Sequence, residues 1–192
     1  MFSVCLCASF QPAPKESHLT AVKRILWYLK HTPSIGLWYP EGAKLELLGY
    51  SDSDFTGYRV DCKSASGGCY LLRQSLVSWL SKKQNCVALS SAEAEYIATG
   101  ACCTQILYMK QSLLDFGISV VKIAKNHVQH SRTKHIGIRH HFLRGHEAKG
   151  DSILTRVRFE DQLADIFTKP LDESTFVRLR SELNVLDSSN IM

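Results

Sequence analysis

The chain has 192 residues, of which 45% are hydrophobic and 21% are charged, and its formal net charge is +5. This length allows one domain with an appendage or two small domains, and the composition indicates a packed core rather than bulk disorder. The seven cysteines include no C-x-x-C pair, so neither a zinc ribbon nor a disulfide framework is indicated. The apolar N-terminus lacks a basic region, and no apolar run is long enough to cross a bilayer. We therefore expect an intracellular protein of the cytoplasm or nucleus, neither secreted nor bound to a membrane.

The first part of the chain predicts one amphipathic helix. Five apolar residues recur at helical spacing and form one stripe: Leu19, Val22, Ile25, Leu26 and Leu29. Ser17 is a suitable N-cap, and the helix should end near Pro33, because the residue before a proline disfavours the helical conformation. We expect a surface helix that docks by its apolar face. A basic helix near nucleic acid is the weaker alternative.

The next stretch predicts strands. The segments expected are a strand over residues 44–52, a turn over 55–57, hairpin strands over 67–72 and 76–80, and a polar, basic loop over 81–85. The first strand runs into Asp52, and Asp54 follows two residues later. An acidic residue at the end of a strand is often only a turn former, and we interpret Asp54 in this way.

A long helix should begin after Ser90 and run to about Asp115, with Gly117 as the residue that ends it. Ser90 suits an N-cap, and Glu93 three residues later suits the reciprocal partner of a capping box. Two residues along a helix are about 200° apart, so Glu95 cannot share a face with Glu93 and is free to point elsewhere. The plainer alternative is that both glutamates are helix-start residues favoured by the macrodipole.

The remaining segments complete a mixed pattern. They are a short apolar stretch of uncertain type over residues 118–123, a basic segment with helical spacing over 127–146, a strand over 153–158, a short helix over 161–168 and an amphipathic helix over 172–185. On the short helix, Asp161 and Asp165 are four residues apart and should share a face. The sequence therefore predicts an α/β fold with one sheet and helices against it.

Several long motifs resemble the ribonuclease H domain of copia-type LTR-retrotransposon Pol polyproteins. They lie at residues 49–54 (GYSDSD), 63–67 (KSASG), 77–84 (VSWLSKKQ), 88–96 (ALSSAEAEY), 130–136 (HSRTKHI) and 161–169 (DQLADIFTK). Residues 18–26 resemble the tail of the reverse-transcriptase region that precedes this domain in such polyproteins. The resemblance thus divides the chain into a reverse-transcriptase or connection tail (1–43), a ribonuclease-H-like domain (44–185) and a disordered tail (186–192).

The resemblance implies a ribonuclease-H-like mixed sheet with flanking helices, and hydrolysis of the RNA strand of RNA–DNA hybrids with two Mg²⁺ ions. By position within the motifs, the catalytic and metal-binding residues are Asp52, Glu95 and Asp165, whereas Asp54 and Asp161 are near neighbours with structural roles. Clustered carboxylates suit this chemistry, because Mg²⁺ prefers oxygen ligands and two ions can clamp a scissile phosphate. The expected partners are the hybrid and the polymerase part of the same polyprotein.

One departure from the family pattern concerns a strand that ends in Cys-Asp-Asn and carries a further catalytic aspartate. Here residues 115–119 run straight into residues 120–124, which resemble the helix after that strand, so we expect one sheet strand and its carboxylate to be lost. Residues 118–123 are available as a replacement strand but carry no acid. Two hypotheses stay open: a ribonuclease impaired by the lost ligand, and a degenerate relic that binds nucleic acid without cutting it.

The basic segment invites three interpretations. A zinc site is disfavoured, because the histidine spacings match no common structural site and no cysteine lies close by. A solvated basic helix face is common. With the resemblance we favour contacts to hybrid phosphates, and the candidate residues are Arg132, Lys134, Arg139 and Arg144, with Lys82 and Lys83 as a second group.

Overall fold

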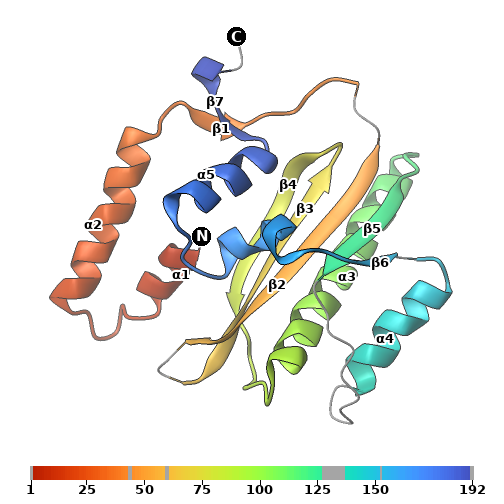
Figure 1. The fold of residues 1–192 in the computed structure, drawn as a ribbon, viewed down its shortest axis with the longest axis horizontal. Coiled ribbons are helices and arrows are strands. Elements are labelled where there is room, and N and C mark those ends of the chain that lie inside the picture. The colour runs from red at the N-terminus through yellow and green to blue at the C-terminus, as the bar shows by residue number, and fades with distance from the viewer. Residues whose placement is uncertain (1, 43–44, 59–60, 127–136, 152, 191–192) are drawn as a thin grey trace.

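The computed structural model describes residues 2–42, 45–58, 61–126, 137–151 and 153–190. Its centre is a five-stranded sheet in the order β4-β3-β2-β5-β6 (Figure 1). The strands are β2 (Glu46–Tyr58), β3 (Lys63–Leu72), β4 (Ser75–Lys83), β5 (Val121–Asn126) and β6 (Leu154–Arg156). The first three are antiparallel to one another, whereas β5 and β6 run parallel to β2. The predicted fold class, a ribonuclease-H-like mixed sheet with flanking helices, is confirmed.

Helices cover both faces of the sheet. They are α1 (Phe2–Ala8), α2 (Glu16–His31), α3 (Ser91–Asp115), α4 (Gly137–Ala148) and α5 (Glu173–Glu182), with the short 3-10 helices η2 (Phe159–Asp161), η3 (Leu163–Phe167) and η4 (Ser188–Asn190). Successive residues of β2 face opposite layers, as the pleat of a strand requires. A Cβ atom on Gly49 would lie 2.4 Å from Ile106 of α3, whereas Tyr50 belongs to the core cluster that contains Leu179 of α5.

The start of α3 follows the predicted cap. The Ser90 Oγ atom accepts a hydrogen bond from the Glu93 N–H at 3.1 Å, and the Glu93 carboxylate accepts one from the Leu89 N–H at 2.7 Å. The return bond thus reaches Leu89 rather than the amide of Ser90 itself. The predicted end is also confirmed, because α3 stops at Asp115 and Gly117 has a φ of 74°. With Glu93 engaged at the cap, Glu95 is left to face the sheet.

Ser90→Ala should destabilise the fold by about 1 kcal/mol, because it removes the side-chain acceptor for an otherwise unpaired amide at the helix start. Urea unfolding followed by circular dichroism measures the change. Ser91→Ala is the matched control, since Ser91 is exposed at the first helical position and gives the cap no acceptor. An equal effect of both substitutions would contradict the assigned cap.

The strands are longer than the sequence predicted. β2 continues past Asp52, which pairs with Gly67 in mid-strand, and reaches Tyr58 through an irregular register after Asp54. The expected turn over residues 55–57 is therefore corrected to a distorted part of the strand, in which Thr56 has a φ of 56°. The hairpin of β3 and β4 is confirmed, but β4 includes residues 81–83, so the predicted polar loop begins only at Gln84.

The position beside β2 is occupied by β5, although one strand was expected to be lost. Residues 46–51 of β2 pair in parallel with residues 121–126 of β5, and β5 pairs in turn with β6. The expected gap in the sheet is thus corrected, because the replacement segment satisfies the backbone groups along this edge of β2. The replacement brings no acid, since its sequence is VKIAKN.

The N-terminal segment differs from expectation. α2 begins at Glu16 with Lys15 as its N-cap, and none of its residues is buried, with Leu26 and Leu29 each 60% exposed. The expected docking of its apolar stripe is therefore corrected, since the described residues leave this face open. No helix in the described part of the chain is long and apolar enough for a membrane span.

The C-terminal end is more ordered than predicted. Strand β1 (Ile35–Leu37) pairs antiparallel with β7 (Val185–Asp187), and η4 follows. Residues 186–190, expected in a disordered tail, thus belong to defined elements, while the division of the chain at residue 43 stays a prediction. The predicted short helix over 161–168 is corrected to the two 3-10 helices η2 and η3, and the last helix is confirmed as α5.

Candidate active site

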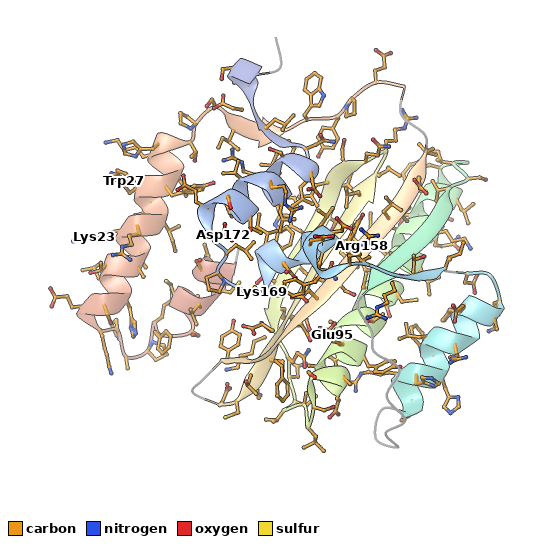
Figure 2. The ribbon with its side chains drawn as sticks, in the orientation of Figure 1. Lys23, Trp27, Glu95, Arg158, Lys169 and Asp172 are labelled. Carbon is orange, nitrogen blue, oxygen red and sulfur yellow. The ribbon has the colours of Figure 1, made fainter. Side chains whose placement is uncertain are left out.

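Three acidic side chains from remote parts of the chain converge beside β2. The Glu95 carboxylate of α3 accepts a hydrogen bond at 3.3 Å from the N–H of Ser53, the residue that follows Asp52. The Lys169 ammonium lies 3.0 Å from Asp165 Oδ2 and 3.6 Å from Asp52 Oδ2. Asp52 and Asp165 are both buried. Figure 2 labels Glu95 on α3 and Lys169 in the segment between η3 and α5. The structure therefore brings together the acids that the sequence selected.

A glycine allows η3 to approach the strand that carries Asp52. Gly67 is the cross-strand partner of Asp52, and a Cβ atom there would lie 2.5 Å from Thr168 Cγ2 and 3.0 Å from the Ala164 carbonyl oxygen. Two hydrogen bonds fasten the approaching segment. Gln162 Nε2 donates to the Ser51 carbonyl at 3.0 Å, and Thr168 Oγ1 donates to Asp52 Oδ2 at 2.5 Å. The position of Asp165 thus depends on the missing side chain at residue 67.

Gly67→Ala should destabilise the fold by about 1–3 kcal/mol, because the added methyl group overlaps atoms of a packed segment and one of them is backbone. Urea unfolding measures the loss. Gly100→Ala is the control, since a Cβ atom on this α3 glycine meets only Arg139 Cδ at 4.0 Å, and alanine favours the helix. A Gly67→Ala protein as stable as the Gly100→Ala protein would contradict the close approach.

Burial and mutual repulsion perturb the carboxyl groups. Burial, and then the charge of Asp52, raise the pKa of Glu95 to about 8. Burial and Asp52 likewise raise the pKa of Asp165 to about 6, against the opposing effect of Lys169. For Lys169, burial alone would lower the pKa, but the two aspartates raise it on balance. Paired titratable groups with shifted pKa values are typical of functional sites.

The donor atoms fit a divalent cation in kind. Glu95 Oε2 and Asp165 Oδ1 are buried and accept no hydrogen bond, so each keeps lone pairs for a cation. Carboxylate oxygens are the ligands that Mg²⁺ prefers, and a positive charge beside Glu95 would favour its ionised form. Among the described residues, no three histidine, cysteine or acidic side chains already surround one point as a metal site would. The site thus offers suitable donor atoms, but among the described residues they are not arranged in advance around one point.

The neighbouring acids occupy different surroundings. The Asp54 carboxylate lies against the backbone of the distorted β2 segment, since a Cβ atom on Gly57 would meet it at 2.3 Å. Burial raises the pKa of Asp54, and the charges of Lys169 and Asp52 also act on it, so this side chain lies at the border of the acidic cluster. Asp161 is exposed in η2, whereas Asp165 is buried in η3. The expectation that Asp161 and Asp165 share a face is therefore corrected, because the chain between them is not one continuous helix.

Sequence reasoning missed three residues that organise the site: Gln162, Thr168 and Lys169. All three lie within the motif at residues 161–169 that was used for the resemblance, but their side chains carried no assigned role. The spacing of Lys169 four residues after Asp165 was the available signal, because residues so spaced meet on one face of a helical turn. The roles of Gln162 and Thr168 could not be found, since their bonds to Ser51 and Asp52 join residues far apart in sequence.

The candidate phosphate contacts are only partly accessible. Lys83 forms an ion pair with Asp61 and lies 4.8 Å from the centre of the Tyr58 ring, whereas Lys82 is exposed. Arg139 and Arg144 are exposed on α4, which packs on α3 through the buried Leu143. Residues Arg132 and Lys134 lie outside the described residues. The assignment of all six to nucleic-acid binding stays a prediction.

Comparison with known proteins places the chain in a family. It is 36% identical over 197 residues to the retrovirus-related Pol polyprotein from transposon RE1 of Arabidopsis thaliana, covering 96% of this chain and 13% of that protein. For the corresponding polyprotein from transposon RE2 of the same plant, the identity is 32%, over 96% of this chain and 14% of that protein.

A structural match is the N-terminal RNase H domain of a Mycobacterium tuberculosis protein, solved as a fusion with maltose-binding protein, with a TM-score of 0.41 and 10% identity over 72% of this chain and 98% of that chain. No family model matches. The chain spans 13–14% of the length of the polyproteins it matches. By its identity to these polyproteins along nearly its whole length, the chain belongs to the retrovirus-related Pol polyproteins of copia-type transposons.

Proposed function

We propose that this domain is a ribonuclease H that hydrolyses the RNA strand of RNA–DNA hybrids with the help of two Mg²⁺ ions. The convergence of Asp52, Glu95 and Asp165 beside β2 carries the proposal. These acids come from a strand, a helix and a 3-10 helix that are far apart in sequence. Burying like charges together costs free energy unless a cation or a proton compensates them, so a chain without a use for the cluster would gain by replacing it.

Each acid has a distinct proposed role. Asp52 would bridge the two ions, Glu95 would complete the site on the α3 side, and Asp165 would hold the ion beside the attacking water. When bound, Mg²⁺ supplies Lewis acidity that favours ionisation of a water and stabilises the leaving oxygen. The chain itself orients the ligands. Thr168 fixes one oxygen of Asp52, and the Ser53 amide fixes one oxygen of Glu95, so both carboxylates are held in place by their neighbours.

The catalytic rate should be reduced relative to an intact family member. The strand beside β2 carries no acid, so the site lacks the further carboxylate that the family pattern supplies there. A missing ligand lowers affinity for the ion it would hold and loosens the position of the substrate. The alternative is a non-catalytic domain that keeps hybrid binding, favoured by this same loss.

Exposed basic side chains supply the proposed contacts to hybrid phosphates. Lys82 at the end of β4 and Arg139 and Arg144 on α4 are all exposed. Such contacts give affinity without sequence preference and weaken as salt rises. The second proposed partner is the polymerase part of the same polyprotein, because this chain matches only 13–14% of the length of its polyprotein relatives.

The deciding experiment incubates the purified chain with three end-labelled duplexes of one sequence: an RNA–DNA hybrid, an RNA duplex and a DNA duplex. We expect slow cleavage of the RNA strand of the hybrid alone, with Mg²⁺ and not with EDTA. Fluorescence anisotropy with the same duplexes measures binding. Hybrid binding without cleavage would favour the non-catalytic alternative, and no binding of any duplex at low salt would contradict both.

A further inference from the structure

The Lys169 side chain is a cation built into the acidic cluster. Its ammonium lies 3.0 Å from Asp165 Oδ2 and 3.6 Å from Asp52 Oδ2, so it forms ion pairs with two of the three carboxylates at once. The Asp52 oxygen that it approaches is also the acceptor of the short hydrogen bond from Thr168. Lys169 follows Thr168 directly, so the same short segment supplies both partners of Asp52.

We propose that Lys169 is a resident counter-ion that competes with divalent cations for the carboxylates of Asp52 and Asp165. This inference rests on the proposed Mg²⁺ site. An ammonium and a divalent cation cannot both approach the same oxygens closely, because their charges repel one another. Entry of the divalent cation therefore requires the Lys169 side chain to move away from Asp52 and Asp165, which weakens cation binding.

The surroundings of Lys169 provide a place for the displaced ammonium. Its Nζ atom lies 4.9 Å from the centre of the Phe159 ring, and this ring is 71% exposed. A cation over an aromatic face is stabilised even at an exposed site. Lys169 itself is partly exposed, and the long flexible lysine stem can turn outward while its aliphatic part stays in contact. The ring contact is present together with both carboxylate contacts, so a side chain that turns outward can keep the ring while it exchanges the carboxylates for solvent.

Competition predicts that removal of the ammonium strengthens cation binding. We expect Lys169→Met to bind Mg²⁺ with roughly tenfold lower Kd than the unsubstituted chain, because the ion no longer displaces an ion pair. Isothermal titration with Mg²⁺ alone measures this, without any nuclease activity. Lys169→Arg keeps a cation and should bind Mg²⁺ as weakly as the unsubstituted chain. Lys110→Met is the matched control, since Lys110 pairs with Asp151 at 3.5 Å outside the site, and it should leave the Kd unchanged.

Two further measurements keep the test decisive. Thermal unfolding in EDTA should show a lower Tm for Lys169→Met, with a larger rise on adding Mg²⁺; if that variant does not fold, Lys169→Gln takes its place. In the unsubstituted chain, acetylation of Lys169, followed by mass spectrometry relative to Lys110, should become faster with Mg²⁺. Equal or weaker Mg²⁺ binding by Lys169→Met would overturn the competition and leave the proposed ribonuclease intact. Absence of Mg²⁺ binding by every variant would instead refute the metal site of the proposed function, and the competition with it.

Discussion

Asp52→Asn should reduce Mg²⁺-dependent cleavage of the hybrid by at least about 10²–10³-fold, comparable to the loss of one preorganised contact in a transition state. The substituted amide removes the charge that would hold the cations, while its size and hydrogen-bonding shape stay close to those of the carboxylate. Its oxygen can still accept the bond from Thr168, so the fold should survive. The initial rate of RNA cleavage, measured at saturating hybrid, gives the effect.

A neighbouring acid provides the control for Asp52→Asn. Asp161→Asn changes the net charge equally and lies four residues before the proposed ligand Asp165, but Asp161 is exposed in η2 and does not join the three converging carboxylates. We expect its cleavage rate to lie within a few-fold of that of the unsubstituted chain. Hybrid affinity, measured by anisotropy in EDTA, should be unchanged or slightly stronger in both variants, since each removes one negative charge. Equal cleavage by Asp52→Asn and the unsubstituted chain would refute the assignment of Asp52.

The sequence predicted well those parts of the site whose signals are local. The cap at Ser90 engages Glu93, which agreed with the motif position that selected Glu95 as the functional glutamate, and the structure places Glu95 beside Ser53. Asp165 was selected by its place in the motif at residues 161–169, which is also a local signal. In each case the information lies within one or two helical turns of chain, where capping and spacing rules apply directly.

The sequence predicted poorly those features that depend on distant partners. Residues 120–124 resemble a helix of the family pattern, and residues 118–123 were available as a replacement strand. The strand that forms is β5 at residues 121–126, because the open edge of β2 offers unpaired backbone groups to the segment that follows α3. Local preference for helix is worth only a fraction of a kcal/mol per residue, so a tertiary demand of this kind overrides it. The apolar stripe of α2 was expected to dock, but a stripe shows only that a face is apolar and does not name its partner.

The free energy of unfolding should fall as pH rises, because the folded chain disfavours the ionised form of Glu95. The pKa of Glu95 is raised from 4.5 to about 8 in the folded chain, chiefly by burial and then by Asp52. Between these two values the folded chain keeps a proton that the unfolded chain has released. Stability therefore falls as pH rises through this window, by at most about 1.4 kcal/mol per pH unit for this single group. Above the folded value the contribution becomes constant, and below the unfolded value the penalty is absent.

Glu95→Gln should remove this dependence, because the amide carries no charge at any pH and its oxygen can still accept the bond from Ser53. Urea unfolding in EDTA at a series of pH values from 5 to 9 measures the difference between the two proteins. We expect the variant to gain stability relative to the unsubstituted chain as pH rises, by a few kcal/mol in total, because each pKa unit corresponds to about 1.4 kcal/mol. Any constant cost of the buried amide cancels from this pH-dependent difference.

Glu93→Gln is the matched control for this series, since Glu93 belongs to the cap and not to the acidic cluster. It should shift stability by a similar amount at every pH in the series. If the free energy of unfolding of Glu95→Gln changes with pH in parallel with that of the unsubstituted chain, the folded chain does not raise the pKa of Glu95. The expected curve would give stability and function a shared origin, because burial and the charge of Asp52 both disfavour the ionised Glu95 that a bound cation would stabilise. Added Mg²⁺ should accordingly flatten the pH dependence of the unsubstituted chain and leave that of Glu95→Gln nearly unchanged.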